Sequence, residues 1–121
     1  MEGSPLVAVI DDDESVRESL PDLLRECGYR VEAFACGEAF LDSEYLDVTQ
    51  CLILDIAMPG MSGPDLQREL QKRGRTTPVI FITGHGGAAD RQQLMREGAV
   101  DCLIKPFNDA DLLRALAIAL L

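Results

Sequence analysis

The chain has 121 residues, of which 47% are hydrophobic and 26% charged, so it is predicted to form one folded domain and not a disordered chain. Its net charge of −10 disfavours direct nucleic-acid binding by this chain and favours a cation or a basic protein surface as ligand. The longest apolar run is too short to span a membrane and no basic-then-apolar leader is visible, so we expect no membrane contact and a cytoplasmic location.

Five apolar, often β-branched runs are predicted to be strands. The first is Leu6–Ile10. The second, Arg30–Phe34, alternates apolar and polar residues, as a half-exposed edge strand does. The other three are continuously apolar, as strands covered on both faces are: Cys51–Leu54, Val79–Thr83 and Cys102–Ile104.

The segments between these runs are predicted to be helices. Ser15 and Glu18 have the spacing of a capping box that opens the first helix, and Gly28 ends it. The remaining helices are expected at Gly37–Leu41, from Pro64 to Gly74, at Ala88–Glu97 and, after an Asn108 cap, at Leu112–Leu121. The last is apolar nearly all round, so we expect it to be buried on more than one side, if necessary by another molecule.

Alternating strands and helices predict an α/β fold with a parallel sheet. Five strands and five helices in this length suit a doubly wound, flavodoxin-like (βα)5 domain that covers residues 1–121, with no linker visible. In such sheets the ligand crevice lies outside the carboxyl ends of the strands.

Four cysteines are scattered along the chain without any C-x-x-C pair, and there is one histidine, so a zinc site is not expected. We expect Cys27, Cys36, Cys51 and Cys102 to be reduced and mostly buried.

Polar residues follow the strands where those strands end. Asp11 and Asp12 follow the first run, Asp55 the third, Thr83 ends the fourth and Lys105 follows the fifth. Carboxylates that converge at one rim repel each other, and a hard divalent cation resolves that repulsion. Ligands that are all oxygen, without histidine or cysteine, favour Mg²⁺. The neighbouring Asp13 and Glu14 are interpreted as acids that complement the helix dipole.

Acids that hold a metal, together with a hydroxyl and a lysine, describe a site for a phosphoryl group. A carboxylate can itself be the nucleophile and form an aspartyl phosphate. Asp55 is the best candidate because it follows a central strand and precedes a loop with Pro59, Gly60 and Gly63.

Four segments, in this order and spacing, carry a family resemblance: "VIDDDESVR", "LILDIAMPGMSG", "FITGHG" and "LIKPF". Over nearly its whole length the chain resembles the receiver domain of two-component response regulators. "TGHG" and "GAVDCLIKPF" are most similar to the FixJ-like branch. The resemblance implies the strand order 2-1-3-4-5.

The resemblance also implies a role for each matching residue. Asp55 corresponds to the phosphoacceptor, Asp12 to a direct Mg²⁺ ligand and Asp11 to its partner acid. The backbone carbonyl of Ala57 corresponds to a third protein ligand of the metal.

On the other side of the site, the resemblance implies that Thr83 is the switch hydroxyl and that Lys105 pairs with a phosphoryl oxygen. Gly84 corresponds to a small residue that leaves room for the phosphoryl group. The Lys105–Pro106 peptide bond is expected to be cis.

As partners, the resemblance implies a sensor histidine kinase and a homodimer through the fourth helix, fifth strand and fifth helix. A FixJ-like parent would add a DNA-binding domain outside this chain, whereas a free-standing regulator is the other possibility. The domain would be a phosphoacceptor switch that assists its own phosphorylation and dephosphorylation, and not an enzyme.

Two positions and two rival classes stay open. Cys102 stands where the family usually has an aromatic residue, and His85 is either a residue that tunes hydrolysis or an exposed loop histidine. One rival is a degenerate receiver that only binds protein. The other is a Mg²⁺ phosphohydrolase, which Ala57 disfavours because a second carboxylate would be expected there.

Overall fold

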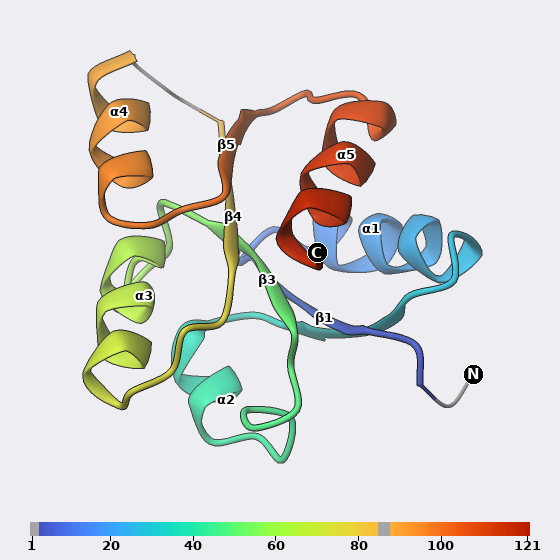
Figure 1. Cartoon of the computed structure of the whole chain (residues 1–121), viewed down its shortest axis with the longest axis horizontal. Helices are drawn as coiled ribbons and strands as arrows, with labels where there is room; N and C mark the ends of the chain where they lie inside the picture. Colours follow the sequence, from blue (N-terminus) through green and yellow to red (C-terminus); the bar gives the residue numbers. More distant parts are fainter. Residues whose placement is uncertain (1–2, 85–87) are drawn as a thin grey trace.

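A computed structural model describes residues 3–84 and 88–121. Within them the chain forms one parallel sheet whose strands lie in the order β2-β1-β3-β4-β5 (Figure 1). The strands are β1 (Leu6–Ile10), β2 (Arg30–Phe34), β3 (Cys51–Asp55), β4 (Val79–Thr83) and β5 (Asp101–Ile104). The predicted fold class and strand order are therefore confirmed.

Helices cover both faces of this sheet. They are α1 (Glu14–Glu26), α2 (Gly37–Leu41), α3 (Gly63–Lys72), α4 (Ala88–Arg96) and α5 (Asp109–Ala119). α1 and α5 lie on one face, and α2, α3 and α4 on the other (Figure 1). Among the described residues, no helix combines the length and the apolar character that crossing a bilayer requires.

The three central strands are buried along their whole length. Side chains alternate between two clusters: in β1, Val7 and Val9 pack with α1 and α5, whereas Ala8 and Ile10 pack with α2, α3 and α4. Because both faces are covered, these strands have continuous apolar sequences. Their carboxyl ends are consequently fixed by packing on two sides.

The two edge strands are less buried. β2 has the half-exposed pattern that its alternating sequence predicts. The expectation that Cys102–Ile104 is covered on both faces is wrong, because Ile104 is 53% exposed and Cys102 alone in β5 is buried. Among the described residues β5 is the last strand of the sheet and pairs with β4 alone, so its surface is less covered than that of the central strands.

The start of α1 also differs from the prediction. Asp13, and not Ser15, is the N-cap, and its side chain accepts a hydrogen bond from the Ser15 N–H at 2.9 Å. The Asp13 N–H in turn donates to Asp11 Oδ1 at 2.9 Å, which holds Asp13 in the extended conformation that an N-cap needs. The helix therefore begins at Glu14, and Cys27, which follows it, is exposed.

α3 begins at Gly63, one residue before the predicted Pro64, and is capped by a capping box that Ser62 forms with Asp65. Gly74 follows α3 with a φ of +78°, as a C-terminal glycine does.

α5 buries one face within the chain, through Leu112, Ala115 and Leu116. Its other face stays open: Ile118 is 55% exposed and Leu121 fully so. Burial of that second face by another molecule stays a prediction.

None of the four cysteines, all of which lie within the described residues, forms a disulfide bond. Cys51 and Cys102 are buried as predicted, and Cys36 is half-buried.

Candidate functional site

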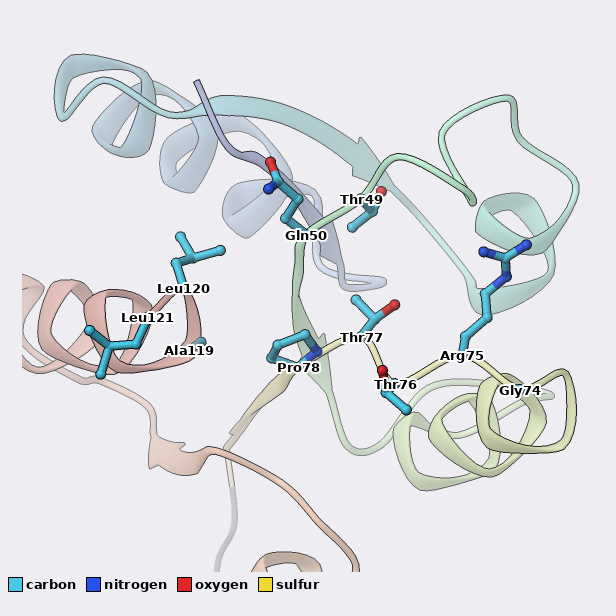
Figure 2. Close-up of a pocket in the computed structure, with 10 residues that line it drawn as sticks. All are labelled: Thr49, Gln50, Gly74, Arg75, Thr76, Thr77, Pro78, Ala119, Leu120 and Leu121. Carbon is cyan, nitrogen blue, oxygen red and sulfur yellow. The ribbon is translucent and has the colours of Figure 1, made fainter. Parts of the chain in front are cut away.

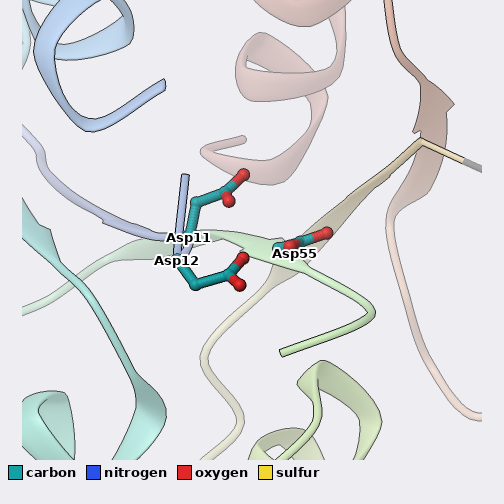
Figure 3. A group of neighbouring side chains, drawn as sticks. All are labelled: Asp11, Asp12 and Asp55. Carbon is teal, nitrogen blue, oxygen red and sulfur yellow. The ribbon is translucent and has the colours of Figure 1, made fainter. Parts of the chain in front are cut away.

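Three carboxylates meet at the carboxyl ends of β1 and β3. Ligand oxygens of Asp11, Asp12 and Asp55 all lie within 4.8 Å of one another. Asp11 is completely buried and Asp55 is 6% exposed, whereas Asp12 is open to solvent. Figure 3 shows the three side chains extending into one region beyond the strands. The sheet topology thus produces the convergence of acids that the sequence predicts.

Asp11 is held by its carboxylate and by both of its backbone groups, and its N–H donates to the Phe34 carbonyl at 3.1 Å. Its Oδ1 accepts the Asp13 N–H, and its Oδ2 accepts Lys105 Nζ at 2.9 Å. Its backbone carbonyl accepts Arg17 Nη1, from α1, at 3.0 Å. The contact from Arg17 was not anticipated from the sequence. A helical residue four positions after the cap, on the side that turns back to the strand end, is the signal that could have indicated it.

Lys105 links the far side of the sheet to this cluster. Its backbone N–H donates to the Thr83 carbonyl at 2.7 Å, which fixes the β5–α5 loop against the end of β4. The Lys105–Pro106 peptide bond is cis, as the resemblance implied. Burial lowers the pKa of the Lys105 ammonium, but its hydrogen bond with Asp11 and the surrounding carboxylates outweigh burial and raise that pKa above its usual value. Lys105 is consequently a fixed positive charge.

The surroundings of Asp55 disfavour the charged form of its carboxyl group. Burial, followed by the Asp11 charge, raises the pKa of Asp55 to about 7, although Lys105 acts in the opposite direction. The contact with Asp12 raises it further. A carboxyl group with this pKa is partly protonated at neutral pH, so a divalent cation would displace a proton when it binds.

The loop after β3 is fixed by the backbone. The Ile56 N–H donates to the Ile82 carbonyl at 3.1 Å, and the Gly63 N–H donates to the Ile56 carbonyl at 2.9 Å. A Cβ on Gly63 would lie 2.3 Å from the backbone oxygen of Asp55. Gly63 is therefore required because the start of α3 approaches the Asp55 backbone too closely for any side chain.

Gly63→Ala is expected to destabilise the protein by about 1–3 kcal/mol, because the added methyl group must displace the Asp55 backbone. Urea unfolding in the absence of metal measures this loss. Gly84→Ala is the matched control, since a Cβ at Gly84 meets nothing within 4 Å. Equal free energies of unfolding for the two variants would contradict this interpretation.

The other predicted positions are placed as follows. Thr83 is 4% exposed at the end of β4. Ala57 is exposed in the loop after β3, and Gly84 is exposed just beyond β4. The role of the Ala57 carbonyl stays a prediction. His85 lies outside the described residues.

A hollow of about 470 Å³ lies at the opposite, amino end of the strands, next to the segments that precede β3 and β4 (Figure 2). The hollow is lined by Thr49, Gln50, Gly74, Arg75, Thr76, Thr77, Pro78, Ala119, Leu120 and Leu121. None of these residues belongs to the predicted site. The acidic site is thus an open rim and not this hollow.

The donor set of the rim suits Mg²⁺. Its three candidate ligands are carboxylates, the cluster holds no histidine or cysteine from residues 3–84 and 88–121, and Asp12 faces solvent so that the ion can keep water ligands. A divalent cation would also relieve the repulsion from Asp11 that, together with burial, raises the pKa of Asp55.

The chain is a doubly wound, flavodoxin-like α/β domain, and its acids and lysine lie outside the carboxyl ends of the strands, where such sheets bind ligands. The family model "Response regulator receiver domain" matches residues 7–117. The chain belongs to this family, the receiver domains of two-component response regulators.

Two curated relatives and one solved structure illustrate the similarity. Nodulation protein W of Bradyrhizobium diazoefficiens is 46% identical over 114 residues, 94% of this chain and 50% of that protein. Transcriptional regulatory protein FixJ of Azorhizobium caulinodans is 43% identical, over 94% of this chain and 54% of that protein. The structure titled FixJ-N superimposes with a TM-score of 0.84 and 36% identity, covering 96% of this chain and 93% of that one. The chain spans about half the length of these curated relatives.

Proposed function

We propose that this domain accepts a phosphoryl group on Asp55 from the phosphohistidine of a sensor histidine kinase. Support comes from one observation: three carboxylates from β1 and β3 and the ammonium of Lys105 share a single open rim. Asp12 and Asp55 would hold Mg²⁺ together with the Ala57 carbonyl, and Asp11 would assist. When bound, the metal would neutralise the carboxylates and polarise the phosphoryl oxygens.

Three residues of the chain would then take part in the transfer of the phosphoryl group. A carboxylate oxygen of Asp55 attacks phosphorus, an O–P bond forms, and the N–P bond to the kinase histidine breaks with its electron pair staying on nitrogen. The ammonium of Lys105, which donates to Asp11, would turn to donate a hydrogen bond to a phosphoryl oxygen. Thr83 supplies a hydroxyl donor from the end of β4. Both contacts favour one of two pre-existing conformations of the domain.

The readout surface would be α4, β5 and α5. α5 and β5 each leave a large apolar side chain exposed, Ile118 and Ile104, which suits contact with a second copy. Because the curated relatives include a nodulation protein and a transcriptional regulatory protein of about twice this length, we propose control of transcription through an output domain outside these residues.

Incubation with acetyl phosphate and Mg²⁺ tests the phosphoacceptor role. We expect intact-protein mass spectrometry to show the addition of one phosphoryl group per chain, because the rim supplies nucleophile, metal ligands and a cation together. A chelator should prevent the addition. A wild-type protein that remains unmodified would favour the degenerate, protein-binding receiver.

Dimerisation is a separate prediction. Beryllofluoride, a mimic of the acyl phosphate, is expected to shift the sedimentation coefficient from monomer towards dimer. Ile118→Asp should prevent this shift without reducing uptake of the phosphoryl group, because Ile118 is exposed on α5 and adjoins Ala119, which lines the hollow at the end of the sheet opposite the rim. An unchanged sedimentation coefficient with beryllofluoride would argue against this interface.

The degenerate receiver is kept as a second candidate because of Cys102. This residue is buried on β5 and cannot act as the large aromatic rotor that the family usually has there. Two alternatives follow: the coupling of the rim to the surface passes through Thr83 and the neighbouring loop alone, or the output is regulated in an unusual way, as in a degenerate receiver.

A further inference from the structure

We propose that Arg17 is a positioning residue that orients Asp12 for Mg²⁺ through the backbone of Asp11. This inference rests on the proposed function, since it concerns the same rim. Arg17 lies in the second turn of α1, and its side chain returns to the end of β1, where Nη1 donates to the Asp11 carbonyl at 3.0 Å. The contact is partly buried.

The carbonyl that Arg17 contacts belongs to the peptide unit between Asp11 and Asp12. That unit is planar, so fixing the direction of the carbonyl also fixes the plane from which Asp12 continues. The Asp11 N–H donates to the Phe34 carbonyl at 3.1 Å, and two further contacts hold the Asp11 carboxylate: the Asp13 N–H on one oxygen and Lys105 on the other. The hydrogen bond from Arg17 differs from these contacts because it acts on the Asp11–Asp12 peptide unit itself.

Asp12 is the residue that needs such control. It is exposed, whereas Asp11 is fully buried and Asp55 nearly so, and packing cannot orient a solvent-facing side chain. Contacts behind a metal ligand commonly change metal affinity by 10- to 100-fold when they are removed.

Whether Mg²⁺ binding weakens or strengthens when Arg17 is replaced distinguishes a positioning role from a purely electrostatic one. A guanidinium near a metal repels the ion, so removal of its charge alone would strengthen Mg²⁺ binding. Loss of positioning would weaken it. Arg17→Met, which keeps the length of the stem and removes the donors, distinguishes the two.

Arg25 provides a matched control on the same helix. Its Nη2 also donates to a strand carbonyl, that of Val31, at 3.0 Å, but at the end of α1 that is remote from the rim. Arg17→Met and Arg25→Met each lose one partly buried bond from an arginine to the backbone, and Arg25→Met also loses an exposed ion pair with Asp22. A structural role alone predicts equal behaviour of the two variants.

The experiment is a calorimetric Mg²⁺ titration of the metal-free protein and its variants, with urea unfolding alongside. We expect Arg17→Met to weaken Mg²⁺ binding about tenfold, Arg25→Met to leave it unchanged, and Arg17→Lys to recover most of the loss. The backbone amide signal of Asp12 in NMR spectra should move in Arg17→Met and stay in place in Arg25→Met. Unchanged or tighter Mg²⁺ binding by Arg17→Met would overturn the inference, and so would equal weakening in both methionine variants. Failure of the wild-type protein to bind Mg²⁺ would instead overturn the proposed function.

Discussion

Asp55→Asn is expected to abolish the uptake of phosphoryl groups from acetyl phosphate completely. The amide that replaces the carboxylate has no negative oxygen to attack phosphorus, and it provides a weaker ligand for Mg²⁺. The substitution preserves size and removes a buried group whose pKa is raised to about 7, so the variant should fold. Intact-protein mass spectrometry after incubation with acetyl phosphate and Mg²⁺ measures the outcome.

Asp22→Asn is the control for this loss. Asp22 is an exposed carboxylate on α1, with 79% of its side chain accessible, and it lies outside the rim. The Asp22→Asn variant should take up the phosphoryl group as the wild-type protein does. If Asp55→Asn still gains one phosphoryl group, the acceptor is another residue, and peptide mapping should then examine Asp11 and Asp12 first.

Mg²⁺ binding is expected to depend strongly on pH. Because burial and the charge of Asp11 raise the pKa of Asp55 to about 7, the metal must displace a proton from this group below that pH. The apparent affinity should therefore fall by up to about tenfold for each pH unit below 7 and become constant well above it. Calorimetric titrations in two buffers of different ionisation enthalpy measure both the affinity and the protons released.

Asp55→Asn again provides the control, since it has no titrating group at this position. Its weaker Mg²⁺ binding should lack the release of a proton centred near pH 7. An affinity of the wild-type protein that is constant from pH 5 to 8 would contradict the raised pKa of Asp55 and the assignment of this carboxylate as a ligand.

The arrangement of strands was well predicted because strands that are buried on both faces have continuous apolar sequences. β1, β3 and β4 are continuous apolar runs, and both of their ends were located within one residue. β5 was misjudged because the sequence "CLI" is the same whether both faces are covered or only one. Its exposure depends on which strand ends the sheet, which a local pattern does not contain.

The members of the site were predicted better than the contacts among them. Parallel topology brings the strand ends together, so Asp11, Asp12 and Asp55 converge as expected. The sequence did not reveal which of several adjacent polar residues would cap α1. That choice depends on the path of the chain out of β1, where Asp11 holds the Asp13 N–H and makes Asp13 the cap.

The ion pair between Asp11 and Lys105 joins residues that are 94 positions apart. No short stretch of the chain contains both halves of the rim, so the site is assembled only when the last strand has joined the sheet. In a partly synthesised or partly unfolded chain, Asp55 would lack the nearby positive charge of Lys105. Under the proposed function, uptake of a phosphoryl group would thereby require that the chain has completed folding.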